Sequence, residues 1–271
     1  MTKIDTHIHG KYSSDSILDY RQLCQKAIKK NYQVIAFTEH YDLIDTELME
    51  YGLLPSKRYF KELDIVKKEF PELEIIAGLE IGEPHIVMDF AKRLLKDMQP
   101  EYIIGSLHVL KTGKNVSMRM YSPLPEKAVR QYYEENLEMV QKGGFDTLGH
   151  LGIYKRSMEC PDPPDESHVY HIIDEIFREM IKKDICLEIN SSGFKTRFNN
   201  HIPDPKILSR YQKLGGELIT ICSDSHDLEL FDKFYKKTLD SLRDLKFHAL
   251  YWRNRGSWNS INIGGRADEK L

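Results

Sequence analysis

Seven segments of the sequence combine an apolar, strand-like run with a His, Asp or Glu at or near its end. In the first, Lys3-Ile4-Asp5-Thr6-His7-Ile8-His9, successive side chains of a strand point to opposite faces, so Asp5, His7 and His9 share one face. Similar runs occur at 34–40, 75–80, 102–108, 147–150, 186–190 and 218–226. Imidazole and carboxylate groups are metal ligands, so the pattern predicts a metalloenzyme.

The positions of the histidines support this prediction. Of the 11 His residues, six stand at predicted strand ends, and the others fall in predicted helices, loops or the tail. A single His is usually structural or exposed. Six of them, accompanied by Glu80 and Asp224, instead favour a shared chemical site.

The ligand types narrow the choice of metal. Imidazole nitrogens and carboxylate oxygens without a thiolate suit Zn²⁺, Mn²⁺ or Fe ions. One ion uses about three or four protein ligands, so this larger set predicts two or three divalent ions. Glu80 has two carboxylate oxygens and could bridge two of them. The candidate metal ligands are His7, His9, Asp15, His40, Glu80, His108, His150, Asp224 and His226.

Segments with helical periodicity separate the predicted strands. The first runs from Asp19 to Lys30, with Asp19 at the cap position, and others are predicted at 56–70 (capped by Ser56), 84–98, 125–142, 166–183, 204–214 and 228–245. Alternating strands and helices indicate parallel strands joined by crossover helices. Because every strand contributes polar residues, we predict an α/β fold with a distorted seven-stranded (β/α) barrel, whose site lies at the carboxyl ends of the strands. An open sheet would concentrate its site at one switch point.

Length and composition limit the class of protein. We expect one domain over residues 1–271, with 247–271 as a strand-like cover or tail. The chain is 41% hydrophobic and 30% charged, with no apolar run of about 18 residues that could cross a membrane. The polar first strand leaves no room for a signal peptide, so we expect a cytoplasmic location and, for the four separated cysteines, the reduced state. A net charge of -3 with mixed signs predicts no nucleic-acid partner.

Taken in order, the short motifs form a specific set: Asp5-x-His7-x-His9, Thr38-Glu39-His40, Gly78-Leu79-Glu80, Gly105-Ser106-Leu107-His108, Gly149-His150 and Ser223-Asp224-Ser225-His226. Each is weak alone, but the ordered set resembles the PHP (polymerase and histidinol phosphatase) family, and within it the stand-alone histidinol-phosphate phosphatases. The resemblance covers essentially the whole chain. It implies a trinuclear centre with ions held by His7, His9, Glu80 and Asp224, by Glu80, His108 and His150, and by Asp15, His40 and His226. Some relatives have His at the position of Asp15.

The resemblance also implies a reaction, the hydrolysis of L-histidinol phosphate to L-histidinol and phosphate in histidine biosynthesis. A water shared by two ions about 3.5 to 4 Å apart would lose its proton near neutral pH and attack phosphorus in line. The planar fork of an arginine suits the phosphoryl group. Arg119, Arg156 and Arg197 follow strand ends, and Arg197 is our first choice because the polar run 190–193 leads into it. We therefore predict as catalytic residues Asp224, His226, Arg156 and Arg197.

The amine and imidazole of L-histidinol phosphate can carry positive charge, so we expect acidic side chains near them. Asp42 and Glu83 follow strand ends closely and could face the amine and imidazole of histidinol. Asp5 is expected to orient His7 or His9 through a hydrogen bond rather than to bind metal.

Three other functions stay open at this point. The same centre could hydrolyse another small phosphate ester or phosphotyrosine. An amidohydrolase also opens with His-x-His, although a middle-strand Lys often bridges its metals, where this chain has Glu80 and His108. A non-catalytic module of the polymerase-associated kind would need a nucleic-acid groove or a second domain, and neither is evident in the sequence. The oligomeric state is open.

Overall fold

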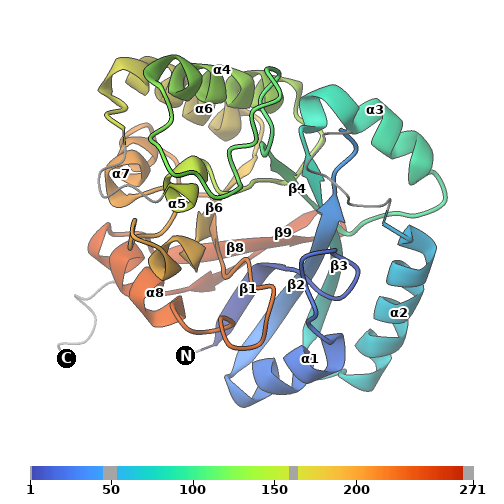
Figure 1. Cartoon of the computed structure of the whole chain (residues 1–271). Coiled ribbons are helices and arrows are strands. Elements are labelled where there is room, and N and C mark those ends of the chain that lie inside the picture. The colour runs from blue at the N-terminus through green and yellow to red at the C-terminus, as the bar shows by residue number, and fades with distance from the viewer. Residues whose placement is uncertain (1, 45–53, 159–163, 265–271) are drawn as a thin grey trace, which may run out of the picture.

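Seven parallel strands form a single sheet that curls into a nearly closed barrel, as the sequence predicts (Figure 1). The structure, a computed structural model, describes residues 2–44, 54–158 and 164–264. The sheet order is sequential from β1 to β7. The strands are β1 (Lys3–Ile8), β2 (Tyr32–Tyr41), β3 (Glu74–Gly82), β4 (Tyr102–Ser106), β5 (Thr147–Leu148), β6 (Cys186–Asn190) and β7 (Ile219–Cys222).

The two edge strands approach each other and complete the barrel just beyond their carboxyl ends. The backbone N–H of Asp224 donates to the carbonyl of His7 at 2.9 Å, and the N–H of His9 donates to the carbonyl of Ser225 at 3.0 Å. These bonds bring the segments after β1 and β7 side by side. Candidate ligands from the two ends of the sheet therefore lie in one place.

Helices surround the barrel on its outer side (Figure 1). Helix α1 shows why: its buried residues Tyr20, Leu23, Cys24 and Ala27 form one face, and the Asp19 carboxylate accepts from the first-turn N–H groups. The helices are α1 (Tyr20–Lys29), α2 (Ser56–Glu69), α3 (Pro84–Leu94), α4 (Glu126–Lys142), α5 (Tyr154–Ser157), α6 (Tyr170–Lys182), α7 (Pro205–Lys213) and α8 (Tyr235–Asp244), with 3₁₀ turns η1 (Ser167–Val169) and η2 (Ser191–Lys195).

Several helix boundaries differ from the sequence prediction. Ser56 is the first residue of α2 rather than its cap, and its hydroxyl donates to the carbonyl of Leu54. Helix α3 ends at Leu94, four residues early, while α8 begins at Tyr235, seven residues late. The sequence prediction extended α3 through residues 95–98 and began α8 at 228 because apolar residues continue at helical spacing into these loops.

The C-terminal segment forms a hairpin, β8 (Ala249–Asn254) and β9 (Ser257–Asn262), within the range 247–271 for which the sequence predicted a strand-like cover or tail, and residues 265–271 lie outside the described residues. The hairpin lies against the amino-terminal end of the barrel. The Trp252 indole N–H donates to the carboxylate of Glu74, the first residue of β3, and Arg253 pairs with Asp146, just before β5. Leu250 and Trp252 join the same hydrophobic core as the barrel strands.

Two expectations concern the class of protein. Among the described residues, no helix is both long and apolar enough to cross a membrane. The side chains of Cys24, Cys186 and Cys222 are buried and form no disulfide, as expected, and Cys160 lies outside the described residues.

Candidate metal centre

The predicted metal ligands converge at the carboxyl ends of the strands, around a cavity of about 590 Å³. His7 and His9 are fully buried beneath it, and the other seven candidates line it. Parallel pairing explains part of this convergence, because His40 of β2 lies directly beside Glu80 of β3. The cavity wall contains Asp15, His40, Asp42, Glu80, His108, Asn115, Ser117, Met118, Arg119, His150, Arg156, Ser157, Lys195, Thr196, Asp224 and His226.

The first group of ligands lies deepest. The Nε2 atoms of His7 and His9 are 2.9 Å apart, and each lies 3.4 Å from Glu80 Oε2. Asp224 Oδ1 lies 3.4 Å from His9 Nε2 and 3.9 Å from His7 Nε2. The backbone of Asp224 has a positive φ of 50°, a conformation that a non-glycine residue adopts at some cost and that here aims its carboxylate inward.

The second group uses the other oxygen of the same glutamate. Glu80 Oε1 lies 2.8 Å from His150 Nε2 and 3.2 Å from His108 Nε2. The Ser106 hydroxyl donates to this oxygen at 2.6 Å. Gly149 makes room for that hydroxyl, since a Cβ there would lie 2.3 Å from Ser106 Oγ. Glu80 is thus shared between two ligand groups.

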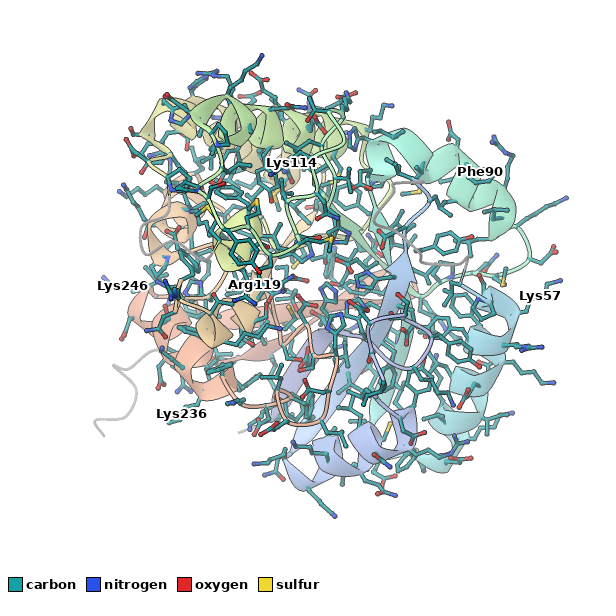
Figure 2. All side chains as sticks on the ribbon, in the orientation of Figure 1. Lys57, Phe90, Lys114, Arg119, Lys236 and Lys246 are labelled. Carbon is teal, nitrogen blue, oxygen red and sulfur yellow. The ribbon has the colours of Figure 1, made fainter. Side chains whose placement is uncertain are left out.

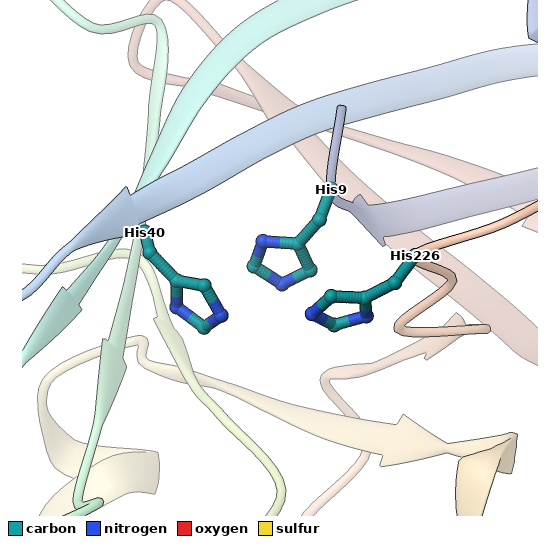
Figure 3. A group of neighbouring side chains, drawn as sticks. All are labelled: His9, His40 and His226. Atoms are coloured by element: carbon teal, nitrogen blue, oxygen red, sulfur yellow. The ribbon is translucent and has the colours of Figure 1, made fainter. Parts of the chain in front are cut away.

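The third group lies nearest the solvent. Asp15 Oδ2 lies 3.1 Å from His226 Nε2 and 3.6 Å from His40 Nε2. Figure 3 shows His40 and His226 on either side of His9, whose ring stacks on both at centroid distances of 4.1 and 4.2 Å. The structure thereby brings all three predicted ligand groups together.

The donor atoms fit divalent metal ions. Glu80 Oε2 is buried and makes no hydrogen bond of regular geometry among the described residues, although His40 Nδ1 lies 2.9 Å away and the Nε2 atoms of His7 and His9 lie 3.4 Å away. Burying a carboxylate oxygen without regular hydrogen bonds costs free energy, and a cation placed between it and the imidazole lone pairs reduces that cost. Three sets of side chains in the described part of the chain each bring their ligand atoms within 4.8 Å of one another. The sets are His7, His9 and Asp224; His9, His40 and His226; and His40, Glu80 and His108.

The pKa values of these groups respond to the same crowding. Burial acts to lower the pKa of His7, but the carboxylates of Glu188, Glu80 and Asp224 outweigh it and hold the pKa well above its usual value. Burial holds the pKa of His9 well below its usual value. Burial would raise the pKa of Glu80, yet the surrounding imidazoles keep it well below the usual range. An ionised carboxylate therefore sits among imidazoles at the centre of the site.

Glu188 of β6 contacts two of the candidate ligands, although the sequence prediction did not assign it to the site. Its Oε2 lies 2.8 Å from His7 Nδ1, and its Oε1 accepts the backbone N–H of His150 at 3.0 Å. A carboxylate behind an imidazole fixes which nitrogen faces the metal. The sequence signal that could have indicated this role is a charged residue in the middle of an otherwise apolar strand. Asp5 was expected to orient a histidine ring, but its carboxylate instead accepts the backbone N–H groups of His7 and Ser223. It therefore holds the backbone in place rather than an imidazole ring.

The two acidic residues predicted to contact substrate lie in different places. Asp42 lines the cavity, and its Oδ1 lies 3.2 Å from His108 Nδ1, where it orients that ligand. Glu83 is 0% exposed and accepts the backbone N–H groups of His108 and Val109. The prediction that Glu83 contacts substrate is therefore wrong, because its carboxyl group supports the loop after β4 from inside. Burial, together with nearby Asp42, raises the pKa of Glu83 to about 7.

Three cations line the cavity, Arg119, Arg156 and Lys195, and the first two are among the three arginines that the sequence predicted. Arg156 donates to Asp224 and, at 2.6 Å, to Ser192. Arg119, labelled in Figure 2, lies on the exposed loop between β4 and α4 with its guanidinium over the ring of Tyr121. Arg197, the first choice from sequence, is exposed and is not among the lining residues, whereas Lys195 at the end of η2 is. The surrounding protein and nearby Arg156 lower the pKa of Lys195.

A seven-stranded barrel with such a centre at its carboxyl end is the architecture of metal-dependent hydrolases that use several ions. A family model for the PHP domain matches residues 5–192, and the chain belongs to the PHP domain family. This confirms the resemblance seen in the motifs.

Relatives match the chain over most of its length. A probable histidinol-phosphatase of Clostridium acetobutylicum is 26% identical over 256 residues, which cover 93% of this chain and 97% of the relative. A histidinol-phosphatase of Lactococcus lactis is 29% identical over 239 residues, covering 83% and 85%. The crystal structure of a histidinol phosphate phosphatase of Lactococcus lactis, complexed with zinc, L-histidinol and phosphate, matches with a TM-score of 0.81 at 25% identity, covering 96% of this chain and 100% of that one.

Proposed function

We propose that this protein is a metal-dependent phosphomonoesterase that hydrolyses L-histidinol phosphate to L-histidinol and inorganic phosphate. The observation that carries the proposal is the match, over nearly the whole chain, to a structure that holds zinc, L-histidinol and phosphate. The site supports it independently, because the cavity of about 590 Å³ suits a small ester and combines a metal-ligand cluster with cations. The reaction belongs to histidine biosynthesis, and we place the protein in the cytoplasm.

The proposed centre binds two or three divalent ions, of zinc, manganese or iron. His7, His9, Glu80 and Asp224 would hold one, Glu80, His108 and His150 another, and Asp15, His40 and His226 a third. When bound, such ions polarise phosphoryl oxygens and lower the pKa of water at the site. The shared position of Glu80, with an oxygen toward each of two groups, supports at least two ions.

The side chains around the cavity have distinct tasks in this proposal. The Arg156 guanidinium and the Lys195 ammonium meet the charge of the phosphoryl group, with Arg119 closing the outer side. Phosphoryl transfer is accelerated mainly by positioning and by stabilising charge, which suits fixed cations. Arg156 is the more strongly fixed, because Ser192 and Asp224 both accept from it. Asp42 gives the cavity an acidic side chain toward which the amine or imidazole of the substrate can turn.

A substrate panel tests the proposal. Purified protein loaded with Zn²⁺ or Mn²⁺ is assayed for phosphate release from L-histidinol phosphate, phosphotyrosine and several aliphatic phosphate monoesters. L-Histidinol phosphate is expected to give the highest kcat/KM, and His9→Ala, which removes a ligand, to abolish release from every ester. A much higher kcat/KM on another ester would keep the phosphatase and overturn the substrate. No release from any ester by metal-loaded protein would overturn both.

A further inference from the structure

His9 lies where two groups of candidate ligands meet. Its Nε2 faces His7, Glu80 and Asp224, at 2.9, 3.4 and 3.4 Å. Its ring is also stacked between His40 and His226, as Figure 3 shows. A neutral imidazole has only one nitrogen with a free lone pair, so the position of its proton decides whether His9 Nε2 can bind a metal ion.

A buried hydroxyl faces the other ring nitrogen. Ser13 Oγ lies 3.1 Å from His9 Nδ1, and Ser13 is 2% exposed. The same hydroxyl accepts the backbone N–H of His40 at 3.0 Å and donates to the carboxylate of Glu39. A serine hydroxyl has one proton and two lone pairs. The Ser13 hydroxyl donates its proton to Glu39 and uses one lone pair to accept the N–H of His40. Its remaining lone pair can only accept a hydrogen bond from a protonated His9 Nδ1.

Glu39 controls the direction of this chain of hydrogen bonds. It is 0% exposed, and its Oε1 accepts the backbone N–H of Gly10 at 2.8 Å and the hydroxyl of Tyr20. Gly10 allows that approach, because a Cβ there would lie 2.8 Å from Oε1 and 2.1 Å from the Tyr20 ring. Three donors, the Gly10 N–H and the hydroxyls of Tyr20 and Ser13, thus converge on the carboxyl oxygens of Glu39, which accept from each of them.

We propose that Ser13 and Glu39 are positioning residues that hold the proton of His9 on Nδ1 and so commit its Nε2 to the ligand group of His7, Glu80 and Asp224. Neither residue is among those that line the cavity. This inference rests on the metal centre of the proposed function. His7 has a carboxylate, Glu188, directly behind it, whereas His9 has a hydroxyl that acts as an acceptor only because Glu39 takes its proton.

Two variants perturb this chain in different ways. Ser13→Ala removes the acceptor of His9 Nδ1. Glu39→Gln keeps the shape but reverses the polarity: the amide oxygen stays with Gly10 and Tyr20, and the amide nitrogen then donates to Ser13 Oγ. The Ser13 proton turns toward His9 Nδ1 and favours the opposite tautomer. Zn²⁺ binding, measured by competition with a chelator, is expected to lose about 10- to 100-fold in one stepwise affinity constant in both variants.

Tyr59→Phe is the matched control. Tyr59 is also 0% exposed and its hydroxyl donates to the carbonyls of Phe37 and Gly78 at 2.8 and 2.7 Å, but it has no hydrogen bond to Ser13 or to the Glu39 carboxylate. Its Zn²⁺ constants are expected to equal those of the natural protein. An equal loss in Tyr59→Phe, or unchanged constants in Glu39→Gln, would overturn the inference. A natural protein that binds no Zn²⁺ would instead overturn the proposed metal centre.

A measurement on the natural protein needs no variant to fold. Long-range ¹H–¹⁵N spectra distinguish the protonated and metal-bound nitrogens of an imidazole. In the Zn²⁺-loaded protein, His9 is expected to carry its proton on Nδ1 and the metal on Nε2. Metal coordination through Nδ1 of His9 would contradict the role of Ser13 whatever the variants do.

Discussion

The two ends of the barrel treat their charged residues in opposite ways. At the amino-terminal end, charges are matched in pairs across the β8–β9 hairpin: Arg253 with Asp146 at 2.9 Å, and Arg255 with Glu101 at 2.9 Å. The Glu74 carboxylate accepts from Trp252 and Asn254 of the same hairpin. The charged groups of these pairs find their partners within the protein, although Arg253 Nε and Asn254 Oδ1 have no hydrogen-bond partner among the described residues.

At the carboxyl end, imidazole and carboxylate ligand atoms from several strands instead converge on one shared space. Glu80 Oε2 makes no hydrogen bond of regular geometry among the described residues although imidazole nitrogens of three histidines lie within 3.4 Å of it, and the Nε2 atoms of His7 and His9 face each other at 2.9 Å. Groups that satisfy one another stabilise a fold, while groups that point lone pairs at a common space require a cation. We therefore regard the amino-terminal end of the barrel as structural and the carboxyl end as the site of chemistry.

The largest effect is expected from Glu80→Gln. The change keeps the shape but removes the charge shared by two ligand groups. Phosphate release from L-histidinol phosphate should fall by more than the roughly 100-fold that the loss of a supporting residue costs, and bound metal per chain should fall with it. Kinetics together with metal analysis measure both. Full activity in this variant would remove the distinction between the two ends.

Substitutions of Arg156 test whether its positive charge or the shape of its guanidinium matters more for catalysis at the carboxyl end of the barrel. Arg156→Ala should lower kcat/KM by about 10²- to 10³-fold, as expected for loss of a group that stabilises developing charge. Arg156→Lys should recover only part of this, because an ammonium lacks the fork that reaches two acceptors. Lys195→Met, at a more exposed position, should lose less than Arg156→Ala. The reverse order would mean that the η2 loop provides the main phosphate contact.

Glu188→Gln tests the support behind His7. The amide can donate to His7 Nδ1 where the carboxylate accepts, so the variant should weaken Zn²⁺ binding by about 10- to 100-fold. Chelator competition measures this, and circular dichroism checks that the barrel is retained. Unchanged Zn²⁺ affinity would mean that Glu188 contributes only to packing.

The smallest effect on activity is expected at the structural end. Arg253→Met breaks the pair with half-buried Asp146 but keeps an apolar stem against Trp258. Its free energy of unfolding should fall by about 1 kcal/mol, with kcat/KM and metal content unchanged. Urea denaturation and steady-state kinetics on the same preparation measure the two quantities. A loss of activity without a loss of stability would show that the ends are coupled.

Much of the barrel and its ligands could be predicted because two regular rules govern them. Strand alternation placed His7 and His9 on one face, and parallel order brought the other strand ends to the same rim. These rules end where the strands end. Arg197 and Lys195 are two residues apart in a 3₁₀ turn and the loop after it, where no period indicates which side chain faces the cavity.

Supporting residues were harder to predict for a different reason. Glu83 has a left-handed backbone, with φ of 47°, that turns its carboxyl toward the N–H groups of the next loop. Ser13 and Glu39 act through hydrogen bonds between segments 26 residues apart, and a hydroxyl carries no signal of which group it serves. Such roles depend on tertiary contacts rather than on local pattern.

The most direct test of the account couples metal content to turnover in one experiment. Protein stripped of metal with a chelator is titrated with Zn²⁺ or Mn²⁺ while phosphate release from L-histidinol phosphate is followed. The account predicts no release without metal, and release that rises until two or three ions per chain are bound. Undiminished hydrolysis by metal-free protein would contradict it.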